Sequence, residues 1–177
     1  MKNPEVLIGL VGFPNSGKDY LSTVLCEDYG FCRYALGDRV KDVLMATDPL
    51  YRGNIQHLEW MKRNDLGHTR EKLQRLGQSI RDINPYFWIK SLPSHLWKFS
   101  VITDIRYSNE LTYLKERGGI SVFLEREGSG EVNDHESEKS TRELASKVDL
   151  RLDNNRPIHE VAAELVEYLE NAGLALE

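Results

Sequence analysis

The feature that most constrains the fold is an apolar run that leads straight into a glycine-rich loop. Residues 6–11 read VLIGLV, and residues 12–19 read GFPNSGKD, which fits the spacing G-x-x-x-x-G-K. Glycines let the backbone turn so that successive N–H groups point inward, and a helix opening near Gly17 would add its positive end. Lys18 supplies a charge for outer phosphates. The stretch predicts a strand, a phosphate-binding loop and a helix in succession.

The residue after the lysine is an acid, where a serine or threonine usually places its hydroxyl on Mg²⁺. Asp19 occupies this position. Carboxylate oxygens are good ligands for hard cations, so Asp19 could meet Mg²⁺ directly or through water. A negative charge also suits the first turn of a helix, whichever way the side chain points. The sequence leaves both roles open.

Short apolar runs alternate with helical patterns along the rest of the chain. The apolar runs lie at 6–11, 31–36, 99–103, 120–125 and 148–152. The helical patterns lie at 17–28, 38–46, 69–81, 84–97, 107–117 and 156–172. The first and third runs are nearly continuous in apolar residues, as in central parallel strands covered on both faces. The alternation predicts an α/β fold with a five-stranded parallel sheet flanked by helices.

Two polar stretches do not fit this core, namely residues 47–68 and 126–140. Ligands of such sheets sit beyond the carboxyl ends of the strands, and segments inserted after the second and fourth strands reach over that edge. We therefore interpret both as mobile covers of a binding site, although surface loops without a role would have the same composition. The length of 177 residues favours a single domain.

The helix predicted over 69–81 is amphipathic. Its apolar residues recur at steps of three and four, on one face: Leu73, Leu76, Ile80 and Ile83. Arginines surround that face at positions 70, 75 and 81. They could bind an anion, although an ordinary solvated helix surface carries the same pattern.

Composition excludes several classes of protein. The net charge of −5 argues against broad binding to DNA or RNA, which needs a basic face. No stretch approaches the roughly 20 apolar residues that span a bilayer, and no secretory signal is recognisable. Cys26 and Cys32 carry no metal-ligand spacing and are predicted to be buried thiols in a reducing compartment. These features predict a cytoplasmic protein.

A second polar cluster follows the third apolar run, in SVITDIRYSNE at 100–110. Asp104 comes just past the predicted strand, on the edge where phosphates would lie, and an acid there can orient magnesium waters or grip a substrate. The guanidinium of Arg106 suits phosphate. Asn109 and Glu110 begin the next helix. The alternative is an acid at a helix start beside a surface arginine.

Several stretches share an order along the chain. They are SGKD (16–19), YALGDRVKD (34–42), Arg70, LQRLGQ (73–78), FWIK (87–90), TDIRYSNE (103–110), DHESE (134–138) and LDN (152–154). In combination they resemble the phage-type deoxynucleoside monophosphate kinases, a branch of the P-loop nucleoside and nucleotide kinases. An aspartate after the loop lysine is usual in that family, whereas Tyr20 and Gln78 depart from its pattern.

The resemblance implies a three-layer P-loop kinase fold with a small nucleotide-monophosphate-binding insert (47–68) and a lid (126–140). It implies transfer of the γ-phosphoryl group of ATP to a deoxynucleoside 5′-monophosphate, giving the diphosphate for dNTP synthesis. The cofactors would be ATP and Mg²⁺, and the partners small nucleotides without nucleic acid or membrane. A phage-encoded protein would work in the host cytoplasm. The oligomeric state stays open, a homodimer included.

The resemblance also implies roles for individual residues. The ATP phosphates would be held by Gly12, Asn15, Ser16, Gly17, Lys18 and Asp19, with Lys18 as the main catalytic charge. The acceptor phosphate would meet Lys41, Arg70 and Arg106, and its base or sugar Gln74, Gln78 and Arg81. Asp104 would lie near the acceptor or, through water, near Mg²⁺, to which Asp19 is also assigned. Further assignments are Arg126 at the transferring group or the adenine, Asn154 and Asn155 at the adenine, and Glu138, with His135 and Ser137, as part of the family motif.

Two other functions share some of these features. A different small-molecule P-loop kinase, acting on a coenzyme precursor or on phosphomevalonate, would have the same loop and lid but other residues between 38 and 90. A nucleotide-binding switch would bind ATP or GTP without phosphorylating a small molecule. The chain has no guanine-reading N-K-x-D stretch, and a switch has little use for arginines at 70, 81 and 106.

Overall fold

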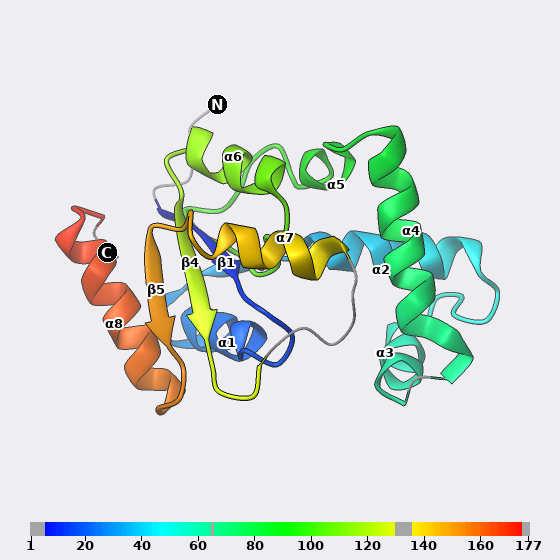
Figure 1. Cartoon of the computed structure of the whole chain (residues 1–177), viewed down its shortest axis with the longest axis horizontal. Helices are drawn as coiled ribbons and strands as arrows, with labels where there is room; N and C mark the ends of the chain where they lie inside the picture. Colours follow the sequence, from blue (N-terminus) through cyan, green and yellow to red (C-terminus); the bar gives the residue numbers. More distant parts are fainter. Residues whose placement is uncertain (1–5, 65, 130–135, 175–177) are drawn as a thin grey trace. The chain divides into compact units, whose positions relative to one another are not determined.

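The computed structural model describes residues 6–64, 66–129 and 136–174. The chain divides into two compact units (Figure 1). The sheet unit comprises the residues up to Tyr34 and from Pro93 onward, and the helical unit comprises Ala35–Leu92. None of the described helices is long and apolar enough to cross a membrane.

The sheet unit is built on five parallel strands, as the sequence predicted. They are β1 (Val6–Val11), β2 (Cys32–Tyr34), β3 (Phe99–Ile102), β4 (Ile120–Glu125) and β5 (Leu150–Asp153), in the order β2-β3-β1-β4-β5. Ile8 in the central strand lies opposite Val101 of β3 and Ile120 of β4. All six residues of β1 are buried, which explains why its sequence is almost wholly apolar.

Helices cover both faces of this sheet and make it the middle of three layers. They are α1 (Lys18–Tyr29), α6 (Ser108–Glu116), α7 (Glu136–Leu144) and α8 (Ile158–Asn171). Ile8 and Leu10 pack in one core cluster with residues of α1 and α8. Gly9 points to the opposite face, where Leu114 of α6 lies against it. α7 packs beside α6. The predicted three-layer α/β class is confirmed.

The helical unit contains no strand within its described residues. Its elements are α2 (Leu36–Thr47), α3 (Ile55–Arg63), the 3₁₀ turn η1 (Leu66–His68), α4 (Thr69–Ile83) and α5 (Phe87–Lys90). Its core joins Leu44 of α2 to Tyr51, Leu58 and Met61, with side chains of α4 packed against them.

Residues 47–68 are more regular than predicted. They contain the helix α3, whose first turn is capped by the Asn54 side chain accepting the His57 N–H at 2.8 Å. The hydroxyls of Tyr51 and Thr69, both fully buried, hydrogen-bond at 2.8 Å and tie the segment to α4. α3 buries only Leu58 and Met61 of its nine residues, so most of its sequence is polar or exposed and resembles a surface loop in composition.

Two helix boundaries also differ from the prediction. The helix expected over 84–97 is reduced to α5, because Asn84 ends α4 and its side chain accepts the Tyr86 N–H in a turn. Pro93 follows α5 and has no N–H to continue a helix. Ile83, expected on the apolar face of α4, is 86% exposed.

The predicted lid of residues 126–140 is described only at its two ends. Arg126 follows β4, and its carbonyl accepts the Ser129 N–H in a turn. Residues 130–135, with His135, lie outside the described residues. α7 begins at Glu136, so the last residues of the predicted lid, 136–140, are helical. Cys26 and Cys32 are free, half-buried thiols.

Candidate active site

The loop between β1 and α1 has the backbone of a phosphate cradle. Gly17, just before α1, has φ of 92°, in the left-handed region that favours glycine. A Cβ at Gly12 would lie 2.8 Å from the Ser16 hydroxyl and 2.9 Å from the Leu124 carbonyl oxygen. The first hydrogen bond of the helix runs from Leu21 N to Gly17 O, so the N–H groups of the preceding turn face out of the helix end. Such an end attracts anions.

Lys18 is held by the loop itself. Its ammonium donates to the carbonyls of Gly12 and Phe13, each at 2.7 Å, and to the Ser16 hydroxyl at 3.1 Å. All three acceptors are uncharged. Burial and, to a lesser extent, the positive charge of Arg106 lower the pKa of Lys18 to about 8, although the negative charges of Asp19 and Asp104 oppose the shift. The loop therefore holds a lysine whose charge an anion would stabilise.

The backbone from residue 103 to 107 is held at the carboxyl edge of the sheet. The Thr103 N–H donates to Tyr34 O at 3.0 Å, and the Ile105 N–H donates to Leu10 O at 3.1 Å. Beyond them, the carboxylate of Glu110, 1% exposed, accepts the N–H groups of Arg106 and Tyr107 at 2.8 and 3.1 Å.

This anchoring fixes the backbone that carries two predicted site residues. Asp104 and Arg106 lie close enough to Lys18 for their charges to act on its pKa. The structure thus brings Lys18, Asp104 and Arg106 together at one edge of the sheet. Sequence analysis gave Glu110 only the role of a helix start, whereas its buried carboxylate orders this backbone.

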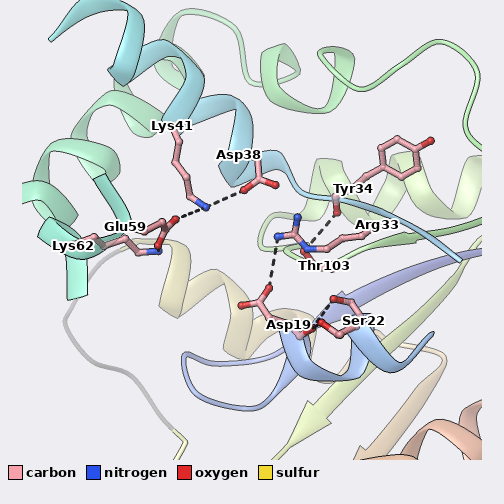
Figure 2. A network of polar contacts seen from close by, with 10 residues as sticks. Asp19, Ser22, Arg33, Tyr34, Asp38, Lys41, Glu59, Lys62 and Thr103 are labelled. Carbon is pink, nitrogen blue, oxygen red and sulfur yellow. Dashed lines mark hydrogen bonds and ion pairs between the residues drawn. The ribbon is translucent and has the colours of Figure 1, made fainter. Parts of the chain in front are cut away.

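Asp19 points outward from the first turn of α1. Its side chain is 87% exposed, and one carboxylate oxygen lies 3.8 Å from the guanidinium of Arg33 on β2 (Figure 2). Arg33 was not predicted as a site residue, because no motif surrounds it. Its position on the strand next to β3 brings a positive charge to the phosphate loop.

The two asparagines after β5 have separate contacts. Asn154 is 7% exposed, and its side-chain amide donates to Ser16 O at 2.8 Å. The carbonyl oxygen of the Asn155 side chain accepts the Glu127 N–H at 2.9 Å, next to Arg126. Sequence analysis placed both near the adenine. The structure places one against the phosphate loop and the other at the start of the predicted lid.

Lys41 of the helical unit lies between two carboxylates. Its ammonium is 2.8 Å from Glu59 and 2.9 Å from Asp38, and Glu59 also pairs with Lys62 at 3.3 Å (Figure 2). Burial by itself lowers the pKa of Lys41, but the hydrogen bonds to Glu59 and Asp38 outweigh it and raise that pKa. Burial by itself raises the pKa of Glu59, but the hydrogen bonds and positive charges of Lys41 and Lys62 outweigh it, so the pKa is lowered.

The other residues predicted to bind the acceptor lie along α4. Arg70, Gln74, Gln78 and Arg81 follow at steps of four, four and three, so the helix places them in one stripe. The Gln78 amide donates to Asp82 at 2.8 Å. The indole N–H of Trp88, 1% exposed, donates to Gly77 O at 3.0 Å, so Trp88 packs against this helix. Glu138 lies in the first turn of α7.

Comparisons with known proteins agree with this geometry. No protein-family model matches the chain. A protein of Acanthamoeba polyphaga mimivirus described as "Putative deoxynucleotide monophosphate kinase" is 29% identical over 189 residues, covering 94% of this chain and 97% of that protein. The shikimate kinase of Acinetobacter baumannii, in complex with shikimate, superposes with a TM-score of 0.55 at 14% identity over 96% of each chain. That of Aquifex aeolicus gives 0.54 at 16% identity, covering 96% of this chain and 99% of that one.

The chain has the P-loop kinase fold. The predicted resemblance to the deoxynucleoside monophosphate kinases is confirmed by the mimivirus protein.

The acids of this P-loop kinase fold suit the metal that accompanies ATP. Mg²⁺ is commonly held by one or two carboxylates together with phosphates and waters. Asp19 and Asp104 supply two carboxylates whose charges reach Lys18. Within the described residues no group of three or more His, Cys, Asp or Glu side chains could hold a metal. The donor set therefore fits an ion that arrives with the nucleotide phosphates.

Proposed function

We propose that this protein transfers the γ-phosphoryl group of ATP to the phosphate of a deoxynucleoside 5′-monophosphate, giving ADP and the deoxynucleoside diphosphate. The observation that carries the proposal is the buried ammonium of Lys18, held by uncharged oxygens beside Asp104 and Arg106. The description of the mimivirus protein supports the acceptor class.

The reaction needs charge and alignment more than proton transfer. A phosphate oxygen of the acceptor forms the new bond to the γ-phosphorus, and the bond to the bridging oxygen of ADP breaks. The attacking oxygen is already an anion, so no general base is required. The residues here hold two phosphates in line and neutralise their charge, Lys18 at the donor and Arg106 at the acceptor. Bound Mg²⁺, held by Asp19 and Asp104, would add further charge neutralisation.

The acceptor itself would be held by the stripe on α4. In this proposal Arg70 and Lys41 meet its phosphate, and Gln74, Gln78 and Arg81 meet its base or sugar. The stripe presents side chains of the right kind, since the guanidinium of Arg70 suits phosphate and the two amides suit base edges. Arg126, at the end of β4, and Glu138, in α7, are proposed to complete the site.

The test is an ADP-release assay with ATP and Mg²⁺ against dTMP, dGMP, dCMP, dAMP, dUMP and the ribonucleoside counterparts. Turnover with one or more deoxynucleotides is expected and would name the base. If protein shown to bind ATP phosphorylates none of them, the proposal is wrong, and a panel of small-molecule acceptors outside the nucleotides becomes the next measurement.

A further inference from the structure

Asn154 lies where sequence analysis expected a contact to the adenine of ATP, but its side chain faces the phosphate loop. We propose that Asn154 is a positioning residue, which aims a backbone N–H of the loop at the phosphates and does not recognise the base. The inference rests on the part of the proposed function that places ATP phosphates in this loop, and not on the identity of the acceptor.

The geometry of a single peptide plane carries the inference. The Asn154 amide donates to Ser16 O at 2.8 Å, in a buried setting. The described chain has no cis peptide bond. In a trans peptide the C=O of one residue and the N–H of the next point in opposite directions. By holding the Ser16 carbonyl, Asn154 therefore fixes the Gly17 N–H on the side away from itself, at the mouth of α1.

Asn154 is itself held firmly enough to act as an anchor. Its own N–H donates to Glu125 O at 2.7 Å, which continues the pairing between β4 and β5. A Cβ at Gly17 would collide with the Asn154 amide. Glycine is therefore required there for two independent reasons, its left-handed backbone and the space that Asn154 occupies.

Ser16 also links Asn154 to the ammonium of Lys18. Ser16 is fully buried, and while its carbonyl accepts from Asn154, its hydroxyl accepts from Lys18 at 3.1 Å. Loss of the Asn154 donor would leave a buried carbonyl without that partner and allow the peptide to turn. Both the Gly17 N–H and the Lys18 ammonium would then lose part of their alignment.

The experiment compares two ligands that share phosphates and differ in the base. Dissociation constants of ATP and of inorganic tripolyphosphate are measured by calorimetry for the wild type and for Asn154→Asp, which keeps the shape but replaces the donor by an acceptor. We expect both affinities to fall by a similar factor, on the order of tenfold or more. A loss for ATP with unchanged tripolyphosphate binding would show an adenine contact and overturn the inference, as would no change for either ligand.

A matched control and a second measurement keep the test decisive. Asn84→Asp makes the same chemical change in a turn of the helical unit, where the side-chain oxygen still accepts the Tyr86 N–H, and should leave both affinities unchanged. If Asn154→Asp does not fold, as judged by circular dichroism, the amide resonance of Gly17 in the wild type gives the answer. It should shift on addition of tripolyphosphate alone, and an unmoved Gly17 signal would overturn the inference.

The two proposals can fail separately. Wild-type protein that binds tripolyphosphate through Gly17 but phosphorylates no deoxynucleotide would contradict the proposed function and leave the role of Asn154 intact. Turnover of a deoxynucleotide by Asn154→Asp with unaltered ATP affinity would do the reverse.

Discussion

The two units each contain a half-buried lysine at the centre of a polar network, and the two surroundings are opposite in kind. Lys18 donates to two carbonyls and a hydroxyl, none of them charged. Lys41 donates to two carboxylates. Burial pushes the pKa of both lysines down, but only Lys41 has charged partners close enough to reverse the shift.

This difference indicates which of the two lysines can bind an anion without first losing a partner. The loop offers Lys18 only uncharged acceptors. An incoming phosphate would supply a negative charge next to the ammonium, so binding offsets the cost of burying it. Lys41 already has that charge from Glu59 and Asp38. To bind the acceptor phosphate, as proposed, Lys41 has to exchange one of these partners. Lys18 can therefore bind a phosphate directly, whereas Lys41 must first release a carboxylate.

The largest effect is expected from removal of the charge at the loop. Lys18→Ala should lower kcat by roughly a thousandfold or more, because the ammonium that neutralises the transferring phosphoryl group is lost. Steady-state ADP release measures it. Lys115→Ala is the control, since Lys115 pairs with Asp149 and a backbone carbonyl at the surface, and the kcat of this variant should stay near that of the wild type. Near-normal turnover of Lys18→Ala would place the catalytic charge elsewhere.

Raising the pH should weaken ATP binding through Lys18. Its pKa of about 8 lies below the ordinary 10.5, so above pH 8 the free protein must take up a proton when the phosphates bind. We expect the affinity for ATP to fall by up to about tenfold per pH unit there. Lys18→Arg, which stays protonated, should remove this dependence. A wild-type affinity that is flat from pH 7 to 9.5 would contradict the lowered pKa.

The same shift affects folding with a definite sign. Between pH 8 and 10.5 the unfolded chain holds a proton on Lys18 that the folded chain has lost, so this residue makes stability rise with pH across that window. Lys41 behaves oppositely. Because its pKa is raised, its contribution is complete below 10.5 and is lost at higher pH.

A smaller effect is expected when one carboxylate is taken from Lys41. Glu59→Gln should lower the free energy of unfolding by about 1–3 kcal/mol, measured by urea denaturation, because the half-buried ammonium of Lys41 loses one of its two charged partners. It should also lower the acceptor KM severalfold, since a phosphate then competes with Asp38 alone. An unchanged KM would make Lys41 a purely structural residue. Glu71→Gln, which removes an exposed pair with Arg75, is the control.

The smallest effect is expected at the ion pair between Asp19 and Arg33. Both side chains reach solvent, and the nitrogen and oxygen are 3.8 Å apart. Arg33→Gln should change the free energy of unfolding by less than about 1 kcal/mol. Urea denaturation at low and high salt measures it. A decrease in the free energy of unfolding clearly above this value would mean that Arg33 stabilises the fold through contacts other than this pair.

Features encoded by local patterns were predictable from the sequence. The buried strands follow from continuous apolar runs, and the loop follows from the spacing of Gly12, Gly17 and Lys18. α3 was missed because it has only nine residues and lies in a polar, turn-rich segment, so too few turns are present for a helical period to stand out. The extent of α5 was overestimated, because the turn at Asn84 and the break at Pro93 depend on how the chain leaves α4.

Features that depend on distant residues were not predictable. The partner of Lys41 on α3 is Glu59, and the partner of Asp19 on β2 is Arg33, and neither pair has a fixed spacing in sequence. The assignment of Asn154 to the adenine followed from its place after the last strand. The direction of its side chain became visible only with the sheet, which sets β5 beside β4 and brings both ends to the loop.

The contact between Asn154 and Ser16 has a consequence for synthesis at the ribosome. The two residues are 138 positions apart, so the phosphate loop emerges long before the amide that anchors it. A nascent chain halted before β5 would carry the complete glycine motif but no support for its Ser16 carbonyl. In the role proposed for Asn154, the loop reaches its full affinity for phosphate only after β5 has paired with β4, so an unfinished chain competes less well for ATP than the folded protein.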